Sequence, residues 1–205
     1  MSDQSPKPSS VDVFVEWAKA RLDEMAADAK VLQSRLGDLD VSLRAQAEQA
    51  VTQINQWVGE GETKLKEVQS QGQAAIADAK AYIDATWPKF QAEADKWVEE
   101  AKNQQATFEA RAQAQAKAWQ NLVNDYLRRA TEVHAQSKAQ AEAQVEQLRA
   151  DAQKVQSDLN AKVDDLSKAG QASWAAMSEA LDESRNAFAK AIEVAAKKFN
   201  EAVKH

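Results

Sequence analysis

The sequence predicts an all-α protein built from elongated, long amphipathic helices, and three observations support this. Apolar residues recur every eleven residues along most of the chain. Eleven residues make three helical turns at about 3.67 residues per turn, so the apolar line stays on one side of a nearly straight helix. Only 5 Gly and 3 Pro occur in 205 residues. A mean hydropathy of -0.63 and 6% aromatic residues leave little large apolar surface for a thick core.

The N-terminus is predicted to be a disordered tail over residues 1–10, because Pro6, Pro8 and the serines beside them disfavour regular structure. Helix is expected to begin after Ser10. Either Ser9 or Ser10 can accept hydrogen bonds from the first free amide groups of that helix. The first ordered element should therefore start within a residue or two of position 11.

The main break is predicted near Pro88, which divides the chain into an N-terminal amphipathic arm, 11–87, and a C-terminal arm with a basic end, 88–205. Proline cannot donate the helical hydrogen bond, so Pro88 marks either a kink or the first turn of a new helix capped by Thr86. A helical hairpin or a bundle would result. Weaker candidate breaks are Gly37 with Asp38, the 58–62 segment, and Gly72. After residue 89 one helix of about 115 residues is permitted, unless it folds back.

The candidate binding surface is the apolar stripe itself, because large aromatic residues lie along it. The proposed members are Trp17, Trp57, Trp87, Phe90, Trp97, Phe108, Trp119, Trp174, Phe188, Ile192 and Phe199. Polar positions such as Gln144 and Arg185 interrupt the stripe, and residue sizes along it are too irregular for a regular coiled-coil seam. A helix resting on an apolar surface needs area rather than a close fit, and Trp suits such a boundary. The same stripe also suits a bundle core in the free protein, which opens on a surface.

Charge and composition exclude several function classes. A net charge of -6 disfavours general nucleic-acid binding, and no apolar run approaches the roughly 20 residues that span a bilayer. The first residues contain no apolar signal-peptide segment, so a cytoplasmic location is expected. The chain has no Cys, and its imidazoles are His134 and His205. Without metal-ligand spacing or a phosphate loop, we expect no catalytic residue, no metal site, no cofactor and no enzyme activity.

The last segment, 185–205, combines basic side chains with one apolar face. Its basic residues include Arg185, Lys190, Lys197, Lys198 and Lys204. Cations near a helix C-terminus complement the helix dipole, and they also attract an anionic surface. Both interpretations are compatible with the sequence.

The tandem eleven-residue repeats, rich in Ala, Gln, Glu and Lys, resemble those of exchangeable apolipoproteins and lipid-droplet coat proteins. The Cys-free composition with its Ala and Gln bias is similar to that of phasins, which coat polyhydroxyalkanoate granules. The resemblance covers roughly residues 11–203 and is one of periodicity and composition. It implies a non-enzymatic protein that binds hydrophobic inclusions or lipid, controls their size and coalescence, and forms homo-oligomers when unbound.

Two other function classes are compatible with the same residues. One is a cytoplasmic scaffold that associates with its own copies as a right-handed coiled coil with an eleven-residue repeat. The other is a hydrophilic stress-protectant that gains helix on drying. A surface coat should change its Trp fluorescence on adding apolar particles, whereas a coiled coil should not, and a protectant should show little helix in solution.

Overall fold

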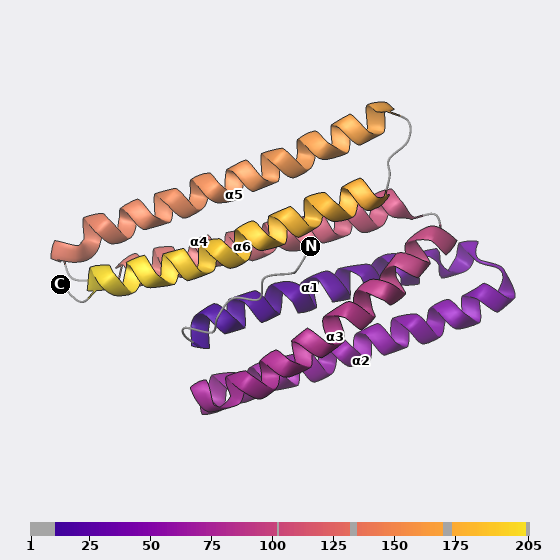
Figure 1. The fold of residues 1–205 in the computed structure, drawn as a ribbon, viewed down its shortest axis with the longest axis horizontal. Coiled ribbons are helices and arrows are strands. Elements are labelled where there is room, and N and C mark those ends of the chain that lie inside the picture. The colour runs from indigo at the N-terminus through magenta and orange to yellow at the C-terminus, as the bar shows by residue number, and fades with distance from the viewer. Residues whose placement is uncertain (1–10, 102, 132–134, 170–173, 204–205) are drawn as a thin grey trace. The chain divides into compact units, whose positions relative to one another are not determined.

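The computed structural model describes residues 11–101, 103–131, 135–169 and 174–203, with side chains except at 135–137, 163, 165–169, 199–200 and 202–203. These residues form six α-helices, one 3-10 turn and no strand (Figure 1). The elements are α1 (Val11–Arg35), η1 (Leu36–Asp38), α2 (Val41–Gln71), α3 (Gln73–Glu100), α4 (Gln104–Thr131), α5 (Ala135–Ala169) and α6 (Trp174–Val203). The predicted all-α class is confirmed. Within the described ranges, no helix has the length and apolar character needed to span a bilayer.

Two of the predicted breaks are present. The turn η1 contains Gly37 and Asp38 and separates α1 from α2. Gly72 separates α2 from α3 with φ of 68°, a left-handed conformation that glycine adopts without a steric penalty, and its N–H donates to the Val68 carbonyl at 2.8 Å. The predicted tail, 1–10, and its cap lie outside the described residues, while α1 begins at Val11 as expected.

Asp40 begins α2 as its N-terminal cap. Its carboxylate accepts hydrogen bonds at 3.0 Å from the backbone N–H groups of Leu43 and Ser42. These bonds stabilise the charged form, so the pKa of Asp40 lies below its ordinary value, with the Leu43 amide as the largest cause. The Arg44 side chain then closes the turn by donating from Nε to the Leu36 carbonyl at 2.9 Å. The reversal between α1 and α2 is thus held by two side chains from the start of α2.

The break predicted near Pro88 is absent, because α3 continues through this residue. Pro88 has no N–H to donate to the carbonyl four residues earlier, which ordinarily destabilises a helix interior. However, Ile83, Trp87 and Phe90 on either side of it are buried and anchor both halves of α3 in the core. Thr86, expected as a possible cap, is itself buried inside the helix. Apolar burial therefore outweighs the lost hydrogen bond.

Two other sequence expectations also changed. The 58–62 segment lies within α2 despite its two glycines. The region after residue 89, which permitted one long helix, instead forms the end of α3 and three further helices. At the first of these ends, the N–H of Asn103 donates to the Val98 carbonyl at 3.3 Å, and Thr107 begins the next ladder by donating to Asn103 at 2.9 Å.

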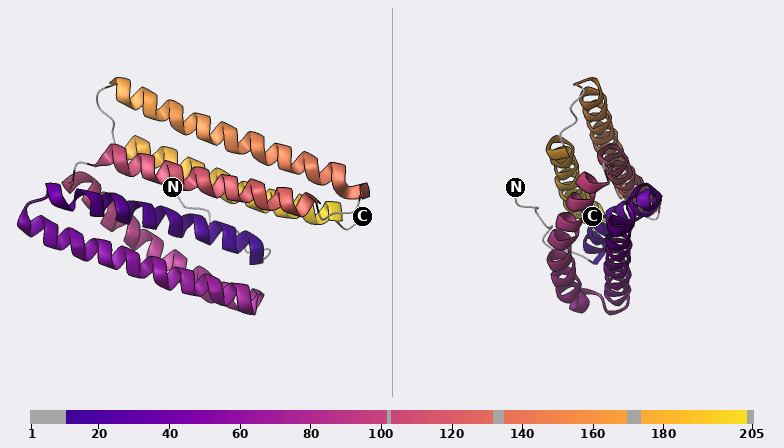
Figure 2. Two further views of the ribbon diagram at one scale, coloured as in Figure 1. Left: turned by 180° about the vertical axis from the view of Figure 1, so that it is seen from behind. Right: turned by 90° about the vertical axis from the view of Figure 1, so that its right-hand side faces the viewer.

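The helices pack as two units. The central unit is Ala18–Ala114, which comprises most of α1, η1, α2, α3 and the start of α4. The terminal unit is Met1–Trp17 with Gln115–His205, which comprises the first turns of α1, the rest of α4, α5 and α6. The predicted arms, 11–87 and 88–205, divide the chain at a different place. The views in Figure 2 show α2 beside α3 and α5 beside α6, the helix pairs that pack within each unit.

In the central unit, α1, α2 and α3 enclose an apolar core. One cluster joins the end of α1, the start of α2 and the end of α3 through Leu32, Leu39, Ala47, Ala50, Val51 and Trp97. Farther along, α1 and α2 approach closely at Gly61, where an added Cβ would lie 2.5 Å from a methyl carbon of Leu22. The Tyr82 hydroxyl on α3 donates to the Trp57 carbonyl of α2 at 3.0 Å. These contacts hold α1 against the α2–α3 pair over much of its length.

In the terminal unit, α4 and α6 meet through aromatic and polar contacts. The rings of Trp119 and Phe188 pack edge to face with centroids 5.2 Å apart. The Gln115 amide donates to the Leu181 carbonyl at 3.3 Å. The first turns of α1 join the same unit through an ion pair between Asp12 and Arg129 at 2.9 Å.

Candidate functional site

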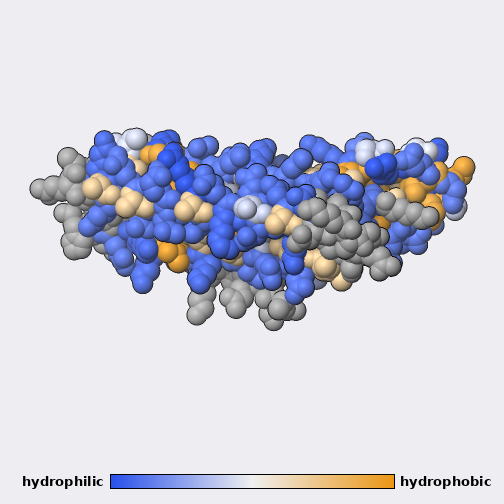
Figure 3. All heavy atoms as spheres, turned by 90° about the horizontal axis from the view of Figure 1, so that it is seen from above, coloured by the Kyte–Doolittle hydropathy of each residue, from blue (hydrophilic) through white to orange (hydrophobic). Residues whose placement is uncertain are grey.

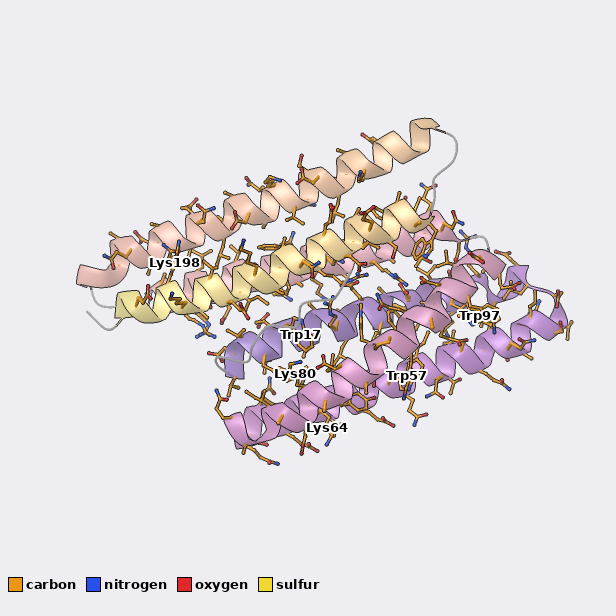
Figure 4. The ribbon with its side chains drawn as sticks, viewed as in Figure 1. Trp17, Trp57, Lys64, Lys80, Trp97 and Lys198 are labelled. Atoms are coloured by element: carbon orange, nitrogen blue, oxygen red, sulfur yellow. The ribbon has the colours of Figure 1, made fainter. Side chains whose placement is uncertain are left out.

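The structure places most of the predicted stripe inside the helix packing. Stripe members with 5% exposure or less are Trp17, Trp87, Phe90, Trp97, Phe108, Trp119, Phe188 and Ile192. Trp57 and Trp174 are half-buried, and the side chain of Phe199 lies outside the described residues. Figure 4 labels Trp17, Trp57 and Trp97 on α1, α2 and α3. In this structure the stripe is the core of each unit.

Little large apolar surface is exposed by the closed helices. Among the described side chains, the exposed large hydrophobic residues are Val41 and Val194. On the face drawn in Figure 3, hydrophilic residues predominate, and apolar positions appear singly or in short groups. Single exposed apolar residues are normal on soluble proteins. Any surface that binds through the stripe must therefore be reached by separating helices.

Charged side chains share the interior of the central unit with the aromatic rings. Arg21, Glu24 and Asp28 on α1 are 3%, 1% and 5% exposed, and Arg111 on α4 is 1% exposed. Charged residues are rarely buried to this extent unless they are paired. The inner face of α1 is thus a mixed face, on which Met25 and Leu32 alternate with three charges.

Asp28 and Arg111 form a two-pronged ion pair. Arg111 Nε lies 2.9 Å from each carboxylate oxygen of Asp28, and Nη2 lies 2.5 Å from Oδ2. Desolvation opposes the charge of Arg111, but Asp28, Glu24 and Asp95 outweigh it, so the pKa of Arg111 lies above its ordinary value. Such a pair contributes little net stability, whereas removing one partner costs about 3–5 kcal/mol by leaving a buried charge uncompensated.

The guanidinium groups of this cluster also face aromatic rings. Arg21 Cζ lies 4.5 Å from the ring centroid of Trp87, and Arg111 Cζ lies 5.5 Å from that of Phe90. A desolvated cation over a ring gains on the order of 2 kcal/mol. The stripe residues Trp87 and Phe90 therefore serve as partners of buried cations as well as apolar contacts.

Sequence reasoning missed this charged cluster, although a signal was present. Arg21 stands eleven residues before Leu32, and Asp28 stands eleven after Trp17. Arg111 likewise stands eleven before Leu122. A charged residue at a position where the repeat expects an apolar one is either buried with a partner of opposite charge or marks an interruption of the stripe. Periodicity alone does not show which of the two applies, because the partner comes from a different helix.

The interior of the terminal unit contains buried polar side-chain atoms that lack hydrogen-bond partners within the described part of the chain. Arg185 on α6 is 4% exposed and donates to Asp182 one turn earlier. The Trp119 Nε1 and the Ser184 Oγ are buried with no hydrogen-bond partner among the described residues. A buried polar atom without a partner costs about 1–3 kcal/mol. The closed terminal unit thus carries unfavourable contributions that would be relieved if these atoms reached water.

Helix α5 contributes no aromatic side chain and few large side chains to that interior. Its 35 residues contain no aromatic side chain. The described residues that it buries are Ala141, Val145, Leu148 and Leu159. Its charged side chains pair along the helix itself, as Lys154 with Asp158 at 2.7 Å and Arg149 with Glu146 at 2.5 Å. Removing α5 from its unit would break none of these ion pairs.

The basic end of α6 is exposed while its apolar face is buried. Lys190, Lys197 and Lys198 are exposed, whereas Phe188 and Ile192 are buried. Figure 4 shows Lys198 near the end of α6. The charged and apolar faces of this segment can therefore act separately, the first in the closed protein and the second only after helices part.

The described residues contain no group of three or more His, Cys, Asp or Glu side chains placed to hold a metal ion. His134 and His205 lie outside the described residues. Comparisons with family models, with curated proteins and with solved structures found no match to this chain. The inner faces of the helices are therefore the candidate functional surface.

Proposed function

We propose that this protein coats the surface of an apolar inclusion, a polyhydroxyalkanoate granule or a lipid droplet, and thereby limits coalescence and controls inclusion size. The observation that carries the proposal is the one-sided distribution of aromatic residues. Most of the described Trp and Phe side chains on α1, α3, α4 and α6 are buried, whereas the outer faces of these helices are polar. A helix of this kind is stable wherever its inner face is covered, by another helix or by an apolar surface.

The transfer to a surface follows from the area that each inner face must bury. In the free protein these faces cover one another, and a fluid apolar surface replaces those contacts with about 25 cal/mol of stabilisation per Å² kept from water. Helix propensity and hydrogen bonds within each helix are unaffected. The bundle can therefore exchange helix–helix contacts for helix–surface contacts without unfolding its helices.

The polar outer faces would then form the new particle surface. Ion pairs one turn apart, such as Lys138 with Glu142 at 3.8 Å and Lys64 with Glu67 at 3.0 Å, survive this exchange because each lies within a single helix. A hydrated layer with a net charge of -6 per chain makes coated particles repel one another. This layer is the proposed physical basis for limiting coalescence.

The first test is adsorption of the wild-type chain to triolein emulsion and to polyhydroxybutyrate particles. We expect the protein to float or sediment with the particles, to keep its circular-dichroism signal for helix, and to shift its Trp emission to the blue. Particle size should stay constant with protein and grow without it. A helical chain with unchanged Trp emission would favour the coiled-coil scaffold, and a chain with little helix in solution would favour the stress-protectant.

A variant test must spare the core. Replacing Trp97, Phe108 and Trp119 together by Ser would remove buried side chains and unfold the protein. We therefore choose Trp57→Ser and Trp174→Ser, because both stripe residues are half-buried. The double variant should adsorb at least tenfold more weakly, since each lost ring is worth about 1.5–3 kcal/mol when buried. Val41→Ser, which removes an exposed apolar side chain outside the stripe, is the matched control and should adsorb as the wild type does.

A further inference from the structure

We infer that the buried ion pair of Asp28 and Arg111 sets the register of α1 within the central unit. The eleven-residue repeat leaves this register open, because a helix that slides by eleven residues presents nearly the same apolar face to its neighbours. Such a slide moves the helix by roughly 16 Å along its axis. Only contacts that do not recur at this interval can distinguish the native register from the shifted ones. This role is independent of the surface coating proposed above.

The ion pair is a contact that does not recur. Arg111 Nε lies 2.9 Å from both carboxylate oxygens of Asp28, and both side chains are buried. The residues eleven positions from Asp28 are Trp17 and Leu39, whose side chains cannot accept a hydrogen bond from a guanidinium. Sliding α1 by eleven residues against α4 would therefore leave Arg111 buried without this carboxylate.

A second carboxylate of α1 behaves in the same way. Glu24 is 1% exposed and lies near enough to Arg111 to stabilise its charge. The residues eleven positions from Glu24 are Val13 and Arg35, so a shifted α1 would bring an apolar side chain or another cation toward Arg111. Because a buried charge without its partner is strongly unfavourable, each shifted register should be populated at least about a hundredfold less than the native one.

The contact between α1 and α3 also depends on register. Arg21 Cζ lies 4.5 Å from the ring centroid of Trp87. The residues eleven positions from Trp87 are Ile76 and Val98, which have no ring to hold a cation. A slide of α1 against α3 would keep apolar faces in contact while Arg21 lost its aromatic partner.

The contact between α1 and α2 adds a steric preference. An added Cβ at Gly61 would lie 2.5 Å from Leu22 Cδ2. Eleven positions from Gly61 stand Ala50, which has such a Cβ, and Gly72, which ends α2. A leucine methyl group can move by rotation of its side chain, so this contact yields more easily than the buried ion pair. We therefore assign the larger part of the register preference to the ion pair.

The experiment measures the register as the distance between two spin labels, by double electron–electron resonance. The chain has no Cys, so Lys30→Cys on α1 and Gln113→Cys on α4 place both labels at exposed positions of the central unit. In this labelled chain, Asp28→Leu with Arg111→Met replaces the ion pair by apolar side chains. We expect one narrow distance distribution with the ion pair. Without it, helix content should persist and a second population should appear, displaced by up to roughly 16 Å.

A matched control removes an ion pair that cannot encode register. Lys64 and Glu67 also belong to the central unit and lie 3.0 Å apart, but both are on α2. Lys64→Gln with Glu67→Gln therefore removes the same two charges without changing any pairing between helices. Its distance distribution should match that of the labelled wild-type chain.

A single narrow distribution at the wild-type distance in the apolar variant would overturn the inference, and the close contact at Gly61 would then be sufficient to set the register. If the apolar variant loses its circular-dichroism signal for helix, Asp28→Asn with Arg111→Gln decides by the same two outcomes, because it removes the charges while keeping polar side chains of similar size. The measurement uses the free protein. Failure to adsorb to particles would therefore contradict the proposed function and leave this inference standing.

Discussion

Helices α1 and α5 are both amphipathic, but they bury different kinds of side chain. In α1, which has 25 residues, the buried side chains are of three kinds: aromatic, aliphatic and charged. In α5, which has 35 residues, the described buried positions are small or aliphatic. From length and amphipathic pattern alone, α5 would be expected to bury more large side chains than α1. The comparison shows that the kinds of side chain a helix buries do not follow from its length or its amphipathic pattern.

The largest effect is expected from removing one carboxylate of an ion pair in each helix. Asp28→Ala leaves Arg111 buried without its carboxylate and should destabilise the central unit by about 3–5 kcal/mol. Urea unfolding followed by Trp fluorescence measures the change. Asp158→Ala removes the partner of Lys154 on α5, where both side chains are more than half exposed, and should leave the unfolding curve unchanged.

The double variant Asp28→Ala with Arg111→Met sharpens the same test. It removes the stranded charge and replaces it with an apolar side chain of similar length, so most of the lost stability should return. A double variant as unstable as Asp28→Ala would mean that the cost comes from lost packing rather than from an uncompensated charge. In that case α1 and α5 would differ in contact area alone.

Replacing Pro88 measures how much stability the central unit loses by having a proline inside α3. Since α3 continues through Pro88 without that residue's amide hydrogen bond, Pro88→Ala should stabilise the unit by up to about 3 kcal/mol. Thermal unfolding followed by circular dichroism gives the measurement. An unchanged melting temperature would show that α3 has adjusted its backbone around the proline at no cost, and that buried Ile83 and Phe90 are not compensating for a defect.

Hydrogen exchange of the wild-type chain compares the two helices directly. Peptides from the middle of α5 should exchange at least tenfold faster than peptides from the middle of α1, because local opening is cheapest where few apolar contacts are broken. Mass spectrometry of the free protein at neutral pH provides the rates. Equal protection in α1 and α5 would contradict this expectation.

Each unit contains one of the two tyrosines, which gives the mildest test. Burial raises the pKa of Tyr82 to about 12, helped by its hydrogen bond to Glu60, and burial likewise raises the pKa of Tyr126 to about 12. The deprotonated form is thus favoured in the unfolded chain, where the pKa is near 10. The stability from these groups is complete below pH 10 and is lost as the pH rises from 10 to 12.

Tyr126→Phe and Tyr82→Phe leave one reporter in the central and terminal units, respectively. Ultraviolet absorbance should show ionisation near pH 12 in both variants. Ionisation near pH 10 in one variant alone would identify the unit whose tyrosine is exposed to solvent at neutral pH.

Periodicity in the sequence was enough to predict the all-α class and the apolar faces of the helices, because amphipathic periodicity is a local property of each segment. It placed Trp97 and Trp119 on apolar helix faces, where both are buried, and it predicted that Gly72 ends a helix. The continuation of α3 through Pro88 depends instead on tertiary packing, because the burial of the flanking residues is set by neighbouring helices. The same holds for Asp28 and Arg111, since no local pattern encodes which faces of distant helices will meet.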